Sequence, residues 1–255
     1  MATSQWARRR QTMYAGGIFL FLFFTITPYI LITSYDKPTC FDGKKNQGEV
    51  SVDLGGPCTL LDESTVIPHT ILWARTFEVR DGFYNAVAYI ENPNQEAGVK
   101  DAVYQFKFYD AQNVIIGERF GRVSVPPGKV FPIFESRIDT GKRIPVRTFF
   151  SFVNDFAWEK MQDSARGITI NNTRISNANT SPRIDADVRN NLFESRKNIV
   201  FIATIFDSNG NAIASSRTLV ERLKADEKKT IAFTWPEGFS SDIARIDIVP
   251  LAIPK

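Results

Sequence analysis

Two cysteines frame the segment whose side chains are best suited to chemistry. Cys40 and Cys58 are the chain's only cysteines, and oxygen-bearing side chains lie between them at Asp42, Asn46, Glu49 and Asp53. Hard oxygen ligands in one constrained loop are the kind that calcium prefers, although this spacing is not that of an EF-hand. Two interpretations stay open: a calcium site, and, as the favoured one, solvated turn residues around Gly43, Gly48 and Gly55.

The redox state of the two cysteines depends on the compartment in which the loop lies. In an oxidising compartment, Cys40 and Cys58 are expected to form a disulfide. The bond would close a loop of about 17 residues, worth roughly 3 kcal/mol in the chain-entropy model. The alternative is two unrelated free thiols, but two exposed thiols are not expected to stay free outside a cell.

Catalytic chemistry has few candidate residues in this chain. His69 is the single histidine, so any Ser-His-Asp or Cys-His unit would have to use it, and a multi-histidine zinc site cannot form. The favoured interpretation of His69 is an ordinary exposed or half-buried side chain. Asp185 and Asp187 share one face of a predicted strand, where a solvated face is a better explanation than acid–base catalysis. Nucleophile-elbow, P-loop and dinucleotide-binding motifs are missing, so no enzymatic activity is expected.

A long apolar segment lies close to the N-terminus. Residues 14–35 carry no charge, and about 20 helical residues cross a hydrocarbon core of about 30 Å. The segment therefore predicts a transmembrane helix, which Pro28 kinks or tilts without ending it. The other interpretation is a cleaved signal peptide, but the run is longer than a signal peptide needs and lacks a good cleavage site.

Charge flanking the apolar segment predicts its orientation. Arg8, Arg9 and Arg10 precede it, and Lys and Arg stay on the cytoplasmic side of a membrane. The N-terminus is expected in the cytoplasm and everything after Asp36 outside it, in a single-pass cell-membrane protein. The net charge is +3, and the sequence contains no other dense basic cluster, so nucleic acid is not an expected partner.

The remainder of the chain has the pattern of an all-β protein. Aromatic and polar residues alternate in 104–108, and strands are also expected at 84–90, 146–153, 200–206, 230–235 and 244–248. Turn residues such as Asp81-Gly82 and Asp139-Thr140-Gly141 separate them. Short strands at this spacing predict a sandwich or a barrel.

The β-rich part divides into two halves that can be laid over each other. Phe108-Tyr109-Asp110 falls on Ile205-Phe206-Asp207, and 125–134 falls on 223–233. The expected organisation is a cytoplasmic N-terminus (1–13), a transmembrane helix (14–35), a cysteine-bracketed juxtamembrane loop (36–69), a first β-sandwich (70–154), a linker (155–166) and a second β-sandwich (167–255). A turn of helix is expected in the linker around Phe156, with Trp158 mostly buried.

Residues 106–110 resemble the signature strand of the FxLYD domain, with Phe108 in place of leucine. Glu91-Asn92-Pro93 and Val125-Pro126-Pro127-Gly128 match further features of that family, while the second half is a degenerate version. The cysteine loop also resembles a cysteine-rich motif of bacterial surface proteins, but Leu54 stands where that motif has a cysteine. The resemblance implies tandem immunoglobulin-like β-sandwiches on a bacterial envelope protein, and it brings no catalytic residues.

Two hypotheses for function follow. The first is a membrane-anchored structural or protein-interaction protein of the cell envelope, with the lipid bilayer and an envelope protein as partners. The second is an extracytoplasmic module that binds a ligand or calcium.

Overall fold

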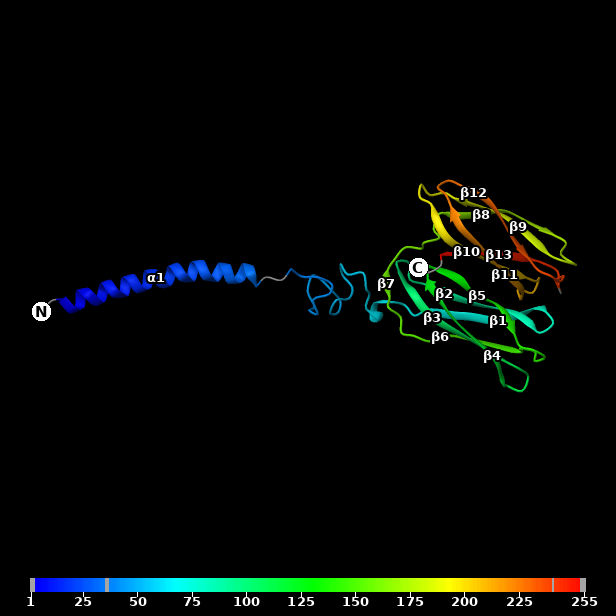
Figure 1. Ribbon diagram of the computed structural model, residues 1–255, viewed down its shortest axis with the longest axis horizontal. Coiled ribbons are helices and arrows are strands. Elements are labelled where there is room, and N and C mark those ends of the chain that lie inside the picture. The colour runs from blue at the N-terminus through cyan, green and yellow to red at the C-terminus, as the bar shows by residue number, and fades with distance from the viewer. Residues whose placement is uncertain (1–2, 35–36, 240, 253–255) are drawn as a thin grey trace. The chain divides into compact units, whose positions relative to one another are not determined.

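The computed structural model describes residues 3–34, 37–239 and 241–252. It divides into two compact units, Met1–Pro57 and Cys58–Lys255. The all-β expectation is confirmed at this level, because one N-terminal helix is followed by a chain that consists mainly of strands (Figure 1).

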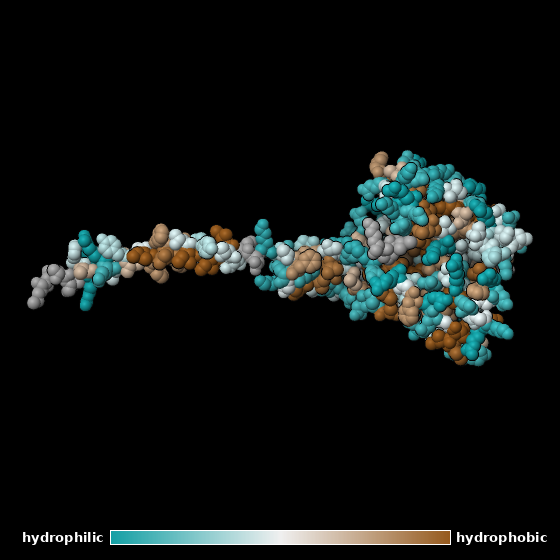
Figure 2. Space-filling view, in the orientation of Figure 1, coloured by the Kyte–Doolittle hydropathy of each residue, from teal (hydrophilic) through white to brown (hydrophobic). Residues whose placement is uncertain are grey.

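The helix of the first unit is α1, Thr3–Thr33, with Pro28 inside it as expected. Residues 6–33 are long and apolar enough to cross a membrane, and their hydrophobic surface is evident in Figure 2. The hydroxyl groups of Thr25 and Thr33 donate to the backbone carbonyls of Phe21 and Tyr29, so these polar side chains are satisfied within the helix itself. Tyr35 and Asp36, at the expected end of the transmembrane segment, lie outside the described residues.

The second unit begins with a short 3₁₀ helix, Glu63–Thr65, and continues as strands. The first half contains β1 (Thr70–Arg80), β2 (Phe83–Asn92), β3 (Ala97–Tyr109), β4 (Ile115–Val125), β5 (Lys129–Asp139) and β6 (Arg147–Phe152). The second half contains β8 (Ile168–Ser176), β9 (Arg183–Asn190), β10 (Arg196–Phe206), β11 (Ala212–Leu223), β12 (Lys228–Thr234) and β13 (Arg245–Ala252). The strands predicted from alternation are confirmed.

Both halves use one antiparallel topology. The first half pairs its strands as β1-β2-β5 and β4-β3-β6, and the second pairs them as β8-β9-β12 and β11-β10-β13. Each strand of the first half therefore has an equivalent in the second: β1 and β8, β2 and β9, β3 and β10, β4 and β11, β5 and β12, and β6 and β13. This shared connectivity agrees with the internal repeat seen in the sequence.

The linker does not form the expected turn of helix. Residues 155–166 instead contain β7, Glu159–Lys160, which pairs with Ala97 and Gly98 of β3. Trp158 is buried as expected, in an edge-to-face contact with Phe156. The local spacing of apolar residues predicts a helix. Pairing with the edge of β3 instead provides hydrogen-bond partners for the backbone of this segment.

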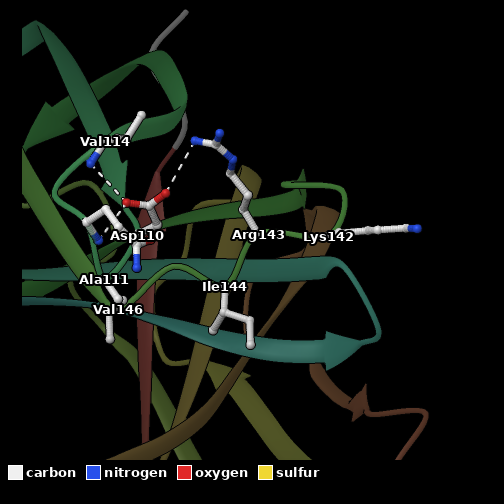
Figure 3. Close-up of a pocket in the computed structure, with 8 residues that line it drawn as sticks. Asp110, Ala111, Val114, Lys142, Arg143, Ile144 and Val146 are labelled. Atoms are coloured by element: carbon white, nitrogen blue, oxygen red, sulfur yellow. Dashed lines mark hydrogen bonds and ion pairs between the residues drawn. The ribbon is translucent and has the colours of Figure 1, made fainter.

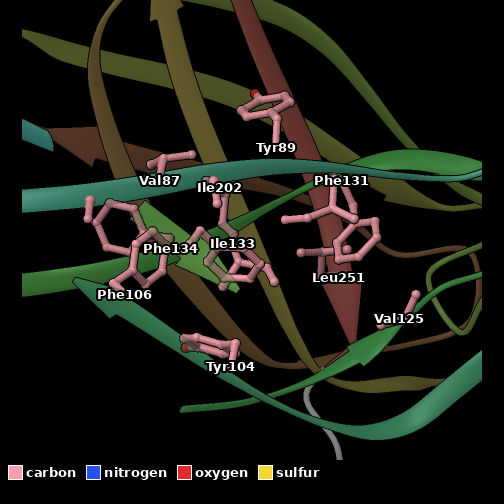
Figure 4. Packing of buried hydrophobic residues seen from close by; sticks show 14 of the residues in the cluster. Val87, Tyr89, Tyr104, Phe106, Val125, Phe131, Ile133, Phe134, Ile202 and Leu251 are labelled. Carbon is pink, nitrogen blue, oxygen red and sulfur yellow. The ribbon is translucent and has the colours of Figure 1, made fainter. Parts of the chain in front are cut away.

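The sheets stack in four layers, β4-β3-β6, β1-β2-β5, β11-β10-β13 and β12-β9-β8 (Figure 1). A core fills each half, and the first core continues across the junction between the halves: Ile202 of β10 and Leu251 of β13 belong to the same buried cluster as Phe106 and Phe134 (Figure 4). Tyr89 of β2 contacts Phe206 with ring centroids 6.3 Å apart. The two halves are thus packed sheet against sheet.

Buried asparagines stabilise the equivalent turns of the two halves. The Asn92 amide nitrogen donates to the carbonyls of Ala97 and Pro126, at 2.8 and 2.9 Å. The Asn190 amide nitrogen donates to Glu194 and Lys224 at 2.7 and 2.9 Å. Both asparagines are fully buried, so each amide depends on these backbone carbonyls for its hydrogen bonds.

Candidate functional site

The cysteine loop forms the disulfide expected from its sequence. Cys40 and Cys58 are bonded to each other, so the sulfur atoms beside Glu49 are not thiolates available to a metal ion. Cys58 is almost fully buried.

The oxygen-bearing side chains of this loop bond to the loop's own backbone. Asp42 accepts hydrogen bonds from the backbone of Thr39 and Lys44 and from the Asn46 amide, 2.9 Å away, and these bonds lower its pKa. Asp53 accepts from the backbone of Asp42 and Gly43. Glu49 accepts from the backbone of Asn46 and Asp53. A calcium ion would compete with these bonds for the same oxygens.

His69 lies against aromatic rings. Its imidazole centroid is 5.0 Å from that of Phe152 and 4.9 Å from that of Phe156. Burial against these rings lowers the pKa of His69, which favours the neutral imidazole. The half-buried environment expected from the sequence is confirmed.

Asp185 and Asp187 of β9 have separate sets of partners. The Arg183 guanidinium bonds Asp185 at 2.8 Å and lowers the pKa of that carboxyl group. Asp187 is bonded by the Asn172 amide at 3.0 Å and the Thr230 hydroxyl at 2.8 Å, with Lys228 Nζ 3.2 Å away. Three strands, β8, β9 and β12, are linked through this one carboxylate.

We expect Asp187 to contribute stability that acid removes. The Asn172, Thr230 and Lys228 bonds hold the pKa of Asp187 below its usual value, so its contribution is complete above the unfolded-state pKa of about 3.9 and is lost as the pH falls through the folded-state pKa. The melting temperature of wild type should therefore fall below about pH 4 more steeply than that of Asp187→Asn. Equal slopes in a melting series from pH 7 to pH 2 would contradict this role, and Asp242→Asn, on an exposed loop, is the matched control.

The outer face of the sheet β4-β3-β6 is the candidate interaction surface. We call outer sheet face the side of this sheet that points away from β1-β2-β5: Val103, Gln105, Lys107 and Tyr109 of β3, Phe120 of β4 and Phe149 of β6. Phe120 and Phe149, on the two edge strands of this sheet, are 60% and 54% exposed, which is high for phenylalanine.

A hollow lies at one end of this sheet, with a volume of about 560 Å³. We call it the tip hollow. The β3–β4 turn contributes Asp110 and Val114, and the loop between β5 and β6 contributes Lys142, Arg143, Ile144 and Val146 (Figure 3). Hydrophobic surface around this end of the first half is visible at the lower right of Figure 2.

Charge in the tip hollow is predominantly positive. The Asp110 carboxylate accepts from the backbone of Gln112 and Val114 and forms an ion pair with Arg143 Nη1 at 3.3 Å. Lys142 points away from this pair in Figure 3, and no ion pair of Lys142 is found among the described residues. The only carboxylate of the hollow is thereby occupied internally, while the Lys142 ammonium and the rest of the Arg143 guanidinium face solvent.

No family model and no curated protein matches this chain. Among solved structures, a β-glucuronidase from glycoside hydrolase family 2 is 11% identical with a TM-score of 0.24, covering 66% of this chain and 24% of its own. A red sea bream transglutaminase is 9% identical with a TM-score of 0.23, covering 73% and 32%. A Bacteroides uniformis β-glucuronidase is 14% identical with a TM-score of 0.20, covering 68% and 22%. The chain spans less than a third of each protein, and likenesses this low assign no activity.

Sequence reasoning missed the tip hollow. It identified Asp110 and Asp139-Thr140-Gly141 only as turn residues, gave Val146 only the start of a strand, and gave Ile144 no role. A comparison of the two halves at single positions carries the missing signal, because exposed aliphatic residues of the first half are equivalent to polar residues or alanines of the second.

Proposed function

We propose that this chain is a single-pass, membrane-anchored protein-interaction protein of the bacterial cell envelope, with no catalysis of its own. The arginines at 8–10 before α1 support a cytoplasmic N-terminus and an extracytoplasmic β-rich unit. The disulfide between Cys40 and Cys58 supports the same orientation, because such bonds persist in oxidising compartments.

We also propose that each half is an immunoglobulin-like sandwich of the FxLYD type. The pairings β1-β2-β5 and β4-β3-β6, repeated in the second half, support this, since immunoglobulin-like folds pair their first, second and fifth strands in one sheet. Phe106 and Phe108 of the signature strand are fully buried, as residues that define a core would be.

One observation carries the proposed interaction. The β10 residues equivalent to the outer sheet face are Val200, Ile202, Thr204 and Phe206, and all of them are buried. Val200, Ile202 and Phe206 form part of the packed junction with the first half. The second half thus uses this face to bind another sheet, while the first half leaves the same face uncovered, with Phe120 and Phe149 on it. We infer that the uncovered face binds a second protein.

A single variant, Phe149→Cys, tests both location and interaction. In intact cells it should react with a membrane-impermeant maleimide, because position 149 is exposed and the native cysteines are disulfide-bonded. With a maleimide–benzophenone, the same site should give a discrete protein adduct after illumination. Asn209→Cys, on an exposed turn of the second half, is the control that should label without forming the adduct. Absence of labelling at both positions in intact cells would contradict the orientation, and labelling of both without any adduct from position 149 would contradict the interaction.

A further inference from the structure

The second half of the chain provides an internal comparison for the tip hollow. Asp110 and Asp207 end equivalent strands, and each carboxylate accepts backbone hydrogen bonds from the residues two and four positions later. Arg147 lies over the Tyr109 ring at 4.9 Å, and Arg245 lies over the Phe206 ring at 4.1 Å. The two ends are built in the same way, although the end of the second half also contacts the first half: the Arg75 guanidinium donates to Asn211, and Ala212 is buried in the junction.

The two ends differ in the aliphatic side chains that the first half carries. Val114 and Ile115 of the first half correspond to Asn211 and Ala212 of the second, because Ile115 pairs with Tyr109 as Ala212 pairs with Phe206.

The neighbouring loop shows the same substitution pattern. Val146 corresponds to Ala244, since their backbone N–H groups donate to the equivalent carbonyls of Tyr109 and Phe206. Two residues earlier, Ile144 corresponds to Asp242. The exposed fractions of the aliphatic residues are large: 45% for Val114, 48% for Ile115, 68% for Ile144 and 65% for Val146.

The structure therefore assigns a binding role to the tip hollow. We propose that it receives a protruding segment of the partner protein in which a carboxylate lies beside aliphatic side chains; this inference rests on the proposed function. Aliphatic walls with an exposed ammonium and guanidinium complement such a segment, since charge complementarity sets partner choice. A concave surface of about 560 Å³ favours a protruding segment over a flat bilayer surface.

The second half also supplies the test variant. In the full-length protein in intact cells, V114N, I144D and V146A replace the aliphatic residues that line the hollow with the residues of the second half. I115A does the same at the exposed position next to Val114. Because the second half folds with these residues, the melting temperature should change little. The yield of the Phe149→Cys adduct should fall about tenfold or more, because several anchor contacts are lost together.

Charge is tested separately with Lys142→Glu, which should lower the adduct yield at least about fivefold at physiological salt. Lys229→Glu, an exposed lysine on β12 of the second half, is the matched control and should leave the yield unchanged. Crosslinking from Ile144→Cys should join a partner peptide in which Asp or Glu neighbours aliphatic residues, identified by mass spectrometry.

The outcomes separate the two proposals. An undiminished Phe149→Cys adduct in the fourfold variant, with its melting temperature unchanged, would overturn the role of the hollow and leave the interaction of the outer sheet face standing. Ile144→Cys adducts with lipid or with a second copy of this chain would also overturn it. No adduct from either position would overturn the proposed function itself.

Discussion

Phe106→Ala should destabilise the protein by about 3–5 kcal/mol, while Phe120→Ala should change its stability by less than about 0.5 kcal/mol. Phe106 is fully buried between the sheets of the first half, 4.9 Å from the Phe150 ring and 6.1 Å from that of Phe108. Its removal leaves a cavity in a close-packed core. Phe120 lies on the neighbouring strand β4 but on the outer sheet face, where it is 60% exposed.

Guanidinium unfolding of the full-length protein in detergent micelles, followed by tryptophan fluorescence, measures both variants. The pair is informative because the two phenylalanines lie on adjacent strands of one sheet and occupy its opposite faces. A large loss of stability in Phe120→Ala would mean that the outer sheet face is covered within the chain, which would remove the basis of the proposed interaction.

Asn92→Ala and Asn190→Ala should each destabilise the protein by about 2–4 kcal/mol. Each amide donates to backbone carbonyls from two separate segments, and removing it leaves those oxygens without this donor. The similar geometry of the two sites predicts similar losses, although the surrounding sequences differ.

The same unfolding measurement tests this pair, with Asn209→Ala as the control. Asn209 lies in the exposed β10–β11 turn, where its backbone N–H, and not its side chain, bonds Asp207. A loss below about 0.5 kcal/mol in either buried variant would show that water replaces the amide at that site.

Several features of this protein could be derived from residue patterns alone. The α1 segment follows from 22 uncharged residues, and the strands around 84–90, 104–108 and 200–206 follow from alternation or apolar runs. These are local properties, because a helix or a strand imposes its period on the sequence that forms it. The repeat could also be predicted from the sequence, in which Asp110 and Asp207 follow equivalent strands. In the structure both carboxylates accept backbone hydrogen bonds in the same pattern.

Other features depended on contacts between distant residues. The linker at 155–166 has a local pattern that suggests helix, and pairing with the edge of β3 instead makes Glu159–Lys160 the strand β7. Asp185 and Asp187 appear alike in sequence, yet Asp187 alone joins three strands, because Asn172 and Thr230 come from β8 and β12.

The sequence by itself determined an apolar helix, a disulfide-bracketed loop and two β-rich repeats. Only the tertiary structure decided that the second repeat buries the face of β10 against the first, while the first leaves the equivalent face and its tip hollow open. The physical reason is that alternation specifies which side chains share a face of a strand, whereas the packing of one sheet on another specifies which of those faces water reaches.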